Sequence, residues 1–299
     1  MTSARTRIRP LANLILHAKI VAIAIVLWGT SNLCAPNSLF AQCVVPRLHH
    51  PWGNFAPGAW KKVRVVTEDL DENGNVLNTS TTETVTKLRA IDDKTFTLLV
   101  DVTIEVAGQR FRSQPKLITK GYYGENAGQI VKVLDLGNER VSVDGKHIQS
   151  QVSRTILNGG QSKRETKIHY SDQVFPHVLK RETVATNLAD ESTTFKSRVE
   201  VTALGKPFHV LSDIRPTSEI RTIYQRSNRK TETTEVFSPE VPGGVVYHAS
   251  KEFDMDGKLV RRSTLELIDY HAVDAGKRMR GRLMQRLRAW KQSRRTSGK

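Results

Sequence analysis

Apolar and polar residues alternate along most of the chain between residues 59 and 274, and threonine and valine are prominent among them. Alternation with a period of two is typical of strands that have one buried and one wet face. The turn Asp71-Glu72-Asn73-Gly74 contains an Asn-Gly pair, which suits a tight hairpin. Strands are predicted at 60–70, 75–91, 95–106, 109–120, 130–134, 140–143, 148–156, 218–227 and 231–238.

Two pairs of segments in this region resemble each other. Segments 83–103 and 182–202 align at a constant offset of 99 and share nine identical residues. Segments 67–85 and 250–268 align at an offset of 183, with an aspartate and a glycine at matching turn positions. Such self-similarity indicates that one supersecondary unit is reused. We predict an all-β fold with internal duplication, in which long antiparallel hairpins form a curved sheet, either a half-barrel or a sandwich.

Changes in composition divide the chain into four parts. Residues 1–41 predict a secretory signal peptide, and residues 42–58 predict an irregular arm rich in proline, histidine and aromatic residues. Residues 59–274 are the predicted duplicated β domain. Residues 275–299 have apolar residues at helical spacing among arginines and lysines, which predicts a basic amphipathic helix, with a disordered tail as the alternative.

The predicted signal peptide has basic residues, an apolar run at 20–28 and then small residues. The run is shorter than the ~20 residues that span a bilayer. Export with cleavage after Ala41 is therefore expected; cleavage after Ala35 and an uncleaved signal anchor are the alternatives. Cleavage after Ala41 leaves Cys43 as the last cysteine, so no internal disulfide forms, and its thiol is free or pairs with another chain.

The net charge of +16 is concentrated at the two ends of the chain. Four basic residues lie in the predicted signal peptide and ten follow Asp274, and neither segment contains an acidic residue. The rest of the chain, residues 42–274, contains 32 basic and 30 acidic residues, so the predicted β domain is close to neutral. A nucleic-acid partner is not expected, because such binding requires a basic face.

The turn at 69–74 has the D-x-D-x-N-G opening of a calcium-binding loop. Such a loop ends in a bidentate carboxylate at its twelfth position, which here is Ser80, and the matching turn has Ser263 there. Both flanks predict strands, whereas calcium loops of this type join helices. The pattern favours a hairpin turn.

Cys43, His49 and His50 carry donor atoms that suit a soft metal. They lie in a short arm without a second cluster of ligands, so we assign no metal-binding residue. The favoured interpretation is that the arm packs Trp52 and Phe55 onto the sheet.

Asp101 and Glu200 occupy matching positions in segments 83–103 and 182–202. They could face each other as an acid–base pair, but alternation favours the wet face of each strand for both. Histidines are scattered over turns and strands, at His147, His169, His177, His209, His248 and His271. We therefore assign no catalytic residue and no cofactor.

The phrases WGNFAPGAWKKVRVVTE, STTET and SPEVPGGVVYHASKEFD, together with the paired VDVT and VEVT blocks, resemble uncharacterised secreted proteins of planctomycete-type bacteria. The resemblance covers 51–270 and implies an exported location without an activity. The PEVPGGVV phrase among long hairpins is similar to lipoprotein-carrier-like half-barrels, in which the concave face holds acyl chains. That similarity implies an architecture and assigns no ligand residue.

These observations predict an exported, non-enzymatic protein of the cell envelope, periplasmic or extracellular, that binds an apolar or amphipathic ligand such as a lipid on a curved sheet. An envelope enzyme with a spatially assembled site and a structural or adhesive scaffold are the alternatives. The basic tail is expected to lie on an anionic membrane or polymer surface, to dock on the sheet, or to remain solvated.

Overall fold

The computed structural model describes residues 47–126 and 130–274. Within them a 3-10 helix, η1 (Arg47–His49), precedes fourteen strands. The strands are β1 (Trp60–Leu70), β2 (Val76–Ile91), β3 (Thr95–Val106), β4 (Gln109–Arg112), β5 (Lys116–Gly121), β6 (Lys132–Val143), β7 (Lys146–Gly159), β8 (Ser162–Tyr170), β9 (Val178–Asn187), β10 (Thr193–Val210), β11 (Asp213–Arg226), β12 (Arg229–Phe237), β13 (Val245–Phe253) and β14 (Leu259–His271). The predicted signal peptide, Cys43 and the predicted basic tail lie outside the described residues.

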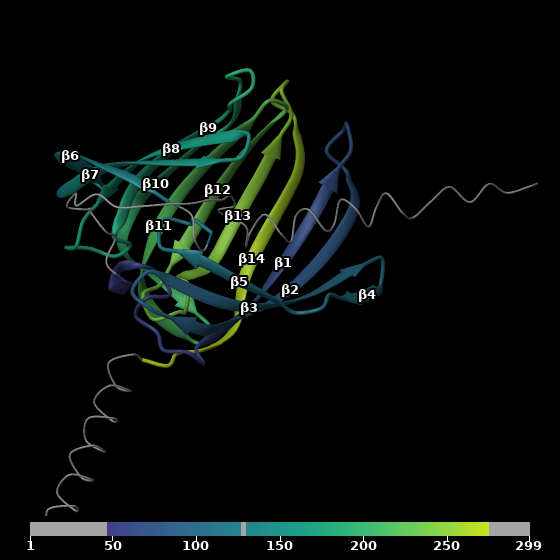
Figure 1. Ribbon diagram of the computed structural model, residues 1–299. Helices are drawn as coiled ribbons and strands as arrows, with labels where there is room; N and C mark the ends of the chain where they lie inside the picture. Colours follow the sequence, from purple (N-terminus) through teal and green to yellow (C-terminus); the bar gives the residue numbers. More distant parts are fainter. Residues whose placement is uncertain (1–46, 127–129, 275–299) are drawn as a thin grey trace, which may run out of the picture.

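All fourteen strands belong to one strongly curved sheet with antiparallel pairing (Figure 1). The order is β4-β3-β2-β1-β14-β13-β12-β11-β10-β9-β8-β7-β6, and β5 pairs with β3 beside β4. Neighbours are mostly consecutive in the chain. Besides the β3–β5 pair, the exception is the pairing of the first strand with the last, where Trp60 pairs with His271 and Asp69 pairs with Arg261. The all-β prediction is confirmed, and a single open sheet corresponds to its half-barrel alternative.

Much of the core lies on the concave side of this sheet, the inside of its curvature. Strand β1 illustrates the alternation. Val63, Val65 and Thr67 are buried, whereas Arg64 and Val66 between them are exposed. The face of any strand residue can therefore be assigned from its register with β1.

The arm packs onto one end of the sheet, where η1 and the following turns lie in Figure 1. Trp52 and Phe55 are buried in a cluster that includes Leu88 of β2. A Cβ at Gly243 would lie 2.9 Å from the Trp52 indole, and the φ of Gly243 is 75°. The close approach and the left-handed backbone both require glycine. The prediction that the arm packs its two aromatic residues onto the sheet is confirmed.

The hairpins β1–β2 and β13–β14 have the same geometry. Thr67 pairs with Ser80 in the first and Ser250 pairs with Ser263 in the second, which is the same register at the offset of 183. Both hairpins have a register shift two to three residues further along the first strand. The resemblance seen in the sequence between these segments therefore extends to their backbone pairing.

Segments 83–103 and 182–202 also form hairpins, β2–β3 and β9–β10, but with different registers. Glu83 pairs with Thr103, whereas the matching Glu182 pairs with Arg198 rather than with Thr202. The loop of the first hairpin spans 92–94 and that of the second spans 188–192. The shift of four residues keeps each side chain on the same face. Duplication of this unit stays a prediction.

Candidate functional site

Hydroxyl side chains line much of the concave face. Thr166 and Thr183 join their hydroxyls across β8 and β9 at 3.1 Å, and Thr233 and Ser250 do so across β12 and β13 at 2.9 Å. The buried threonines and serines of this face include Thr67, Thr82, Thr84, Thr86, Ser153, Thr155, Thr166, Thr183, Ser218 and Thr222. Because each hydroxyl can both donate and accept hydrogen bonds, this face suits a ligand with polar as well as apolar parts.

Three charged residues from distant strands meet on the concave face. Lys61 lies on β1, Arg181 on β9 and Glu235 on β12, and all three are half-buried. Five strands separate β1 from β9 in the sheet order, a span of roughly 30 Å in a flat sheet. Lys61 and Arg181 nevertheless both interact with the carboxyl group of Glu235. Only a deep concavity brings them to the same carboxyl group.

Desolvation outweighs attraction at each of these three groups. Burial lowers the pKa of Lys61 to about 8, although Glu235 opposes the change. Burial lowers the pKa of Arg181 to about 10, and repulsion from Arg164 contributes while Glu235 opposes it. Burial raises the pKa of Glu235, and Arg181 and Lys61 offset only part of the rise. The charged form of each group is therefore less favourable here than in water.

Further charges extend this group toward the end of β5. Lys120 on β5, Glu125 just after it and Arg164 on β8 interact electrostatically with one another. Burial is the leading cause that lowers the pKa of Lys120 and Arg164 and raises that of Glu125. Because β5 and β8 lie toward opposite ends of the sheet order, the two ends of the sheet approach each other here. We name the following six residues the interior charge cluster: Lys61, Lys120, Glu125, Arg164, Arg181 and Glu235.

A buried histidine beside the interior charge cluster has an unused nitrogen. His248 on β13 pairs with Glu235 of β12 and is 5% exposed. Its Nε2 atom is buried and has no hydrogen-bond partner among the described residues. Burial, followed by repulsion from Lys61, lowers the pKa of His248 to about 4, so the ring is neutral at pH 7. Buried polar atoms normally have a partner, and a ligand in the concavity would supply one.

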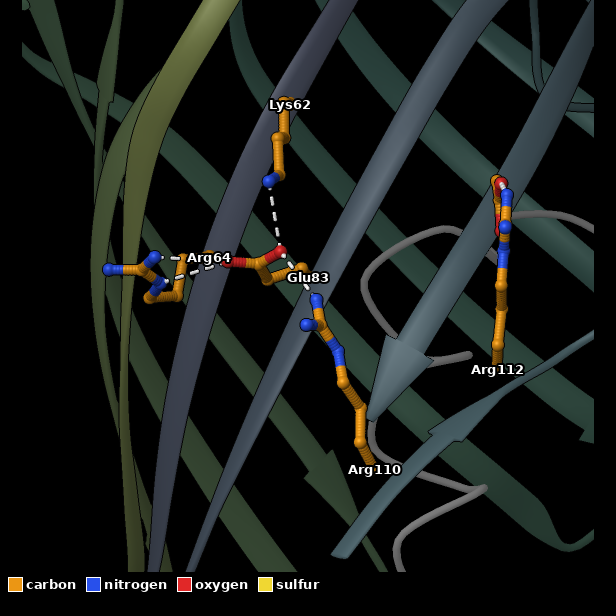
Figure 2. A network of polar contacts seen from close by, with 6 residues as sticks. Lys62, Arg64, Glu83, Arg110 and Arg112 are labelled. Atoms are coloured by element: carbon orange, nitrogen blue, oxygen red, sulfur yellow. Dashed lines mark hydrogen bonds and ion pairs between the residues drawn. The ribbon is translucent and has the colours of Figure 1, made fainter. Parts of the chain in front are cut away.

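The convex face carries ion pairs of a different kind, shown in Figure 2. The carboxylate of Glu83 on β2 forms ion pairs with Lys62 at 2.9 Å, Arg64 at 3.0 Å and Arg110 at 3.5 Å. Hydrogen bonds from Lys62 and then Arg64 lower the pKa of Glu83. Here attraction outweighs desolvation, as expected for ion pairs that solvent still reaches. The network joins β1, β2 and β4 across the sheet surface through one shared carboxylate.

The two carboxylates that share matching positions in the sequence lie apart in separate ion pairs. Asp101 pairs with Arg112 of β4, with Nε and Oδ1 3.2 Å apart, and Glu200 pairs with Arg198 of its own strand at 2.5 Å. The hydrogen bond from Arg112 lowers the pKa of Asp101. Both side chains are on the wet face, as alternation favours.

A cavity of about 240 Å³ lies beside Glu200 and is walled by residues of β6, β9 and β10 and the turn after β6. Its volume is smaller than that of typical ligand pockets.

The turn with the calcium-like opening uses its carboxylate on its own backbone. The Asp71 Oδ1 atom accepts the N–H groups of Asn73 and Asn75, both at 2.8 Å. In the matching turn, Asp254 accepts the N–H groups of Asp256 and Lys258 in the same way. The aspartates therefore stabilise hairpin turns, as the sequence favours.

The two histidines of the arm lie in different surroundings. The ring of His49 packs against those of Tyr170 and His177, whereas the ring of His50 packs against Phe96 at 4.5 Å between centroids. Within 47–126 and 130–274, no group of three or more histidine, cysteine or acidic residues could hold a metal ion. In the same ranges, no helix has the length and hydropathy needed to cross a bilayer.

Comparisons with known proteins extend these observations only slightly. No family model and no curated protein matches the chain, so the resemblance to planctomycete-type secreted proteins stays a prediction. A candidate exported protein with a YmcC-like fold from Bacteroides fragilis aligns with a TM-score of 0.28 and 9% identity over 72% of this chain and 97% of its own. A candidate lipoprotein from Parabacteroides distasonis aligns with the same score and identity over 75% of this chain and 98% of its own. Salmonella typhi OmpF in complex with daunomycin aligns with a TM-score of 0.21 and 7% identity, over 71% of this chain and 97% of its own.

Similarity at this level assigns no function, so the ligand chemistry has to come from the residues of this chain. The sequence did not point to Lys61, Arg181 or Glu235. A signal for two of them was present, because Lys61 has the parity of Val63 in β1 and Arg181 has the parity of Leu179 in β9. Charged residues in phase with buried apolar positions mark an interior charge.

Proposed function

We propose that this chain is an exported, non-enzymatic protein of the cell envelope that binds an amphipathic ligand on the concave face of its sheet. The observation that carries the proposal is the mixed lining of that face. Apolar residues flank the interior charge cluster on the same face, with Val63 and Val65 beside Lys61 on β1 and Val199 of β10 paired with Arg181. Export rests on the charged, apolar and small-residue order of 1–41.

A pair of tryptophan substitutions on one strand tests the proposal. Thr233 faces the concavity beside Glu235, and the adjacent Thr234 is exposed on the convex face. Fluorescence titration with a nitrobenzoxadiazole-labelled dodecanoic acid and its alcohol counterpart measures binding. Thr233→Trp should weaken binding by roughly tenfold, about 1.4 kcal/mol, because its ring fills the concavity. Thr234→Trp, the matched control, should leave binding unchanged.

Two outcomes would reject this function. Absence of binding of both probes by the folded wild-type protein would favour a structural scaffold with a filled interior. Equal weakening by both tryptophan variants, with circular dichroism like that of the wild type, would place the ligand elsewhere. Mass spectrometry of protein purified from its own host is the complementary measurement, and co-purification of an amphipathic molecule is the expected result.

The basic tail, residues 275–299, adds a separate proposal about the surface to which the protein binds. Ten basic residues and an apolar stripe suit an anionic membrane, where each basic residue contributes roughly 1 kcal/mol. Deletion of 275–299 should reduce sedimentation with phosphatidylglycerol vesicles at low salt and leave probe binding to the sheet unchanged. Unreduced sedimentation would reject a surface role.

A further inference from the structure

The interior charge cluster contains more positive than negative charge. It has four basic residues and two carboxyl groups, drawn from β1, β5, β8, β9, β12 and the segment after β5. Burial lowers the pKa of all four basic groups and raises the pKa of both carboxyl groups. Strand register independently places Lys61, Arg164, Arg181 and Glu235 on the same face of the sheet. A concavity with excess positive charge favours an anion.

We infer that the interior charge cluster binds an anionic group, a carboxylate or a phosphate, which Lys61 and Arg181 contact directly. The inference rests on the proposed function, because the anion would be the head group of the amphipathic ligand. It extends that function by stating the charge of the ligand and the residues that bind the charged group. A guanidinium suits both oxyanions because its N–H groups can bond two oxygens at once.

The surroundings of the two cations complete this site. Glu235 lies between them and competes with any incoming anion for both. The unused Nε2 atom of His248, on the strand next to Glu235, offers a further polar contact. Val65 and Leu265, which pair across β1 and β14, form a buried apolar cluster with Val63 on the face that carries Lys61. Charged and apolar side chains therefore lie along one face, as an anionic amphipath requires.

The wild-type protein gives the first test. Labelled dodecanoic acid should bind at least about tenfold more tightly than labelled dodecanol, because charge-assisted hydrogen bonds exceed neutral ones by this amount. The preference should shrink as salt rises from low to physiological concentration. Equal affinity for the acid and the alcohol would overturn the inference and leave the proposed function standing.

Substitutions with opposite expected signs give the second test. Arg181→Gln should weaken binding of the acid by about tenfold or more and leave the alcohol unaffected. Glu235→Gln should strengthen binding of the acid severalfold, because it removes the competing carboxylate. Arg198→Gln, on the convex face of the neighbouring β10, is the matched control and should change neither. A purely structural role for Arg181 and Glu235 would weaken both probes together, which contradicts the inference.

Inorganic phosphate distinguishes a lipid head group from a free anion. Phosphate at millimolar concentration should displace the labelled acid only weakly if the apolar chain contributes to binding. If phosphate displaces the labelled acid at the same concentration as unlabelled acid does, the result would support the anion site and contradict the amphipathic function. Displacement of the alcohol but not of the acid would contradict the anion site.

Discussion

Lys61→Met should make the protein more stable at neutral pH, against the usual effect of losing an ion pair. The pKa of Lys61 falls from 10.5 to about 8 because burial disfavours the ammonium more than Glu235 favours it. That difference corresponds to about 3.4 kcal/mol of unfolding free energy at pH 7. The Nζ atom also donates to the carbonyl of Val245 at 3.3 Å, and losing this bond costs about 1 kcal/mol. The expected net gain is about 2 kcal/mol.

The pH dependence of this gain identifies its cause. Between pH 8 and 10.5 the unfolded chain holds a proton on Lys61 that the folded protein has lost, so wild-type stability from this group rises with pH. Below pH 8 the full cost of the buried ammonium is present. Urea unfolding of wild type and Lys61→Met at several pH values should show a gain near 2 kcal/mol at pH 7 that disappears by pH 10.5. A variant that is less stable at pH 7, by an amount independent of pH, would refute the dominance of desolvation.

Three further predictions concern other parts of the fold. Stability should fall as pH falls from 6.5 to about 4, because the unfolded chain takes up a proton on His248 before the folded protein does, and His248 alone should cost up to about 3 kcal/mol. Urea unfolding of His248→Asn should show a weaker dependence of stability on pH. An unchanged dependence would contradict this role of His248. Leu88→Ala, at a fully buried position, should cost about 2–5 kcal/mol in the same assay, whereas the control Leu77→Ala, 69% exposed, should cost under ~0.5. Gly244→Ala should lower the melting temperature more than Gly257→Ala, because both have positive φ but a Cβ at Gly244 would lie 2.6 Å from a phenylalanine ring; equal losses would show that the ring yields.

The hairpins could be predicted from the sequence because their signals are local. Alternation in 60–70 and 95–106 gave strands whose bounds agree with β1 and β3, and the Asn73-Gly74 turn needs only its own residues and Asp71 to close. The pairing of β1 with β14 could not be predicted, since it joins residues 192 to 211 positions apart. Equal hairpins can close in several ways, and the choice depends on packing across the concavity.

The interior charge cluster escaped sequence analysis for the same reason. Lys61 precedes Lys62, and the two residues look alike in sequence, yet one faces the concavity and the other contacts Glu83 on the convex face. The immediate neighbours of Arg181 are polar, so its alternation with Leu179 is the one local signal that it is an interior residue. Their common target, Glu235, is more than 50 residues from the nearer of them. Convergence of this kind becomes visible only when the curvature of the sheet is known.

The two faces of the sheet use the same residue types to opposite effect, and this contrast supports the proposal that the concave face is the one that binds a ligand. On the convex face, Lys62 and Arg64 lower the pKa of Glu83, so these charges stabilise one another. On the concave face, the pKa of Lys61 and Arg181 is lowered although Glu235 attracts both. Methionine or glutamine at these two positions would fold at lower cost. Residues that reduce stability are typical of binding sites, so the cost of burying these two cations supports the proposal that they bind an anion.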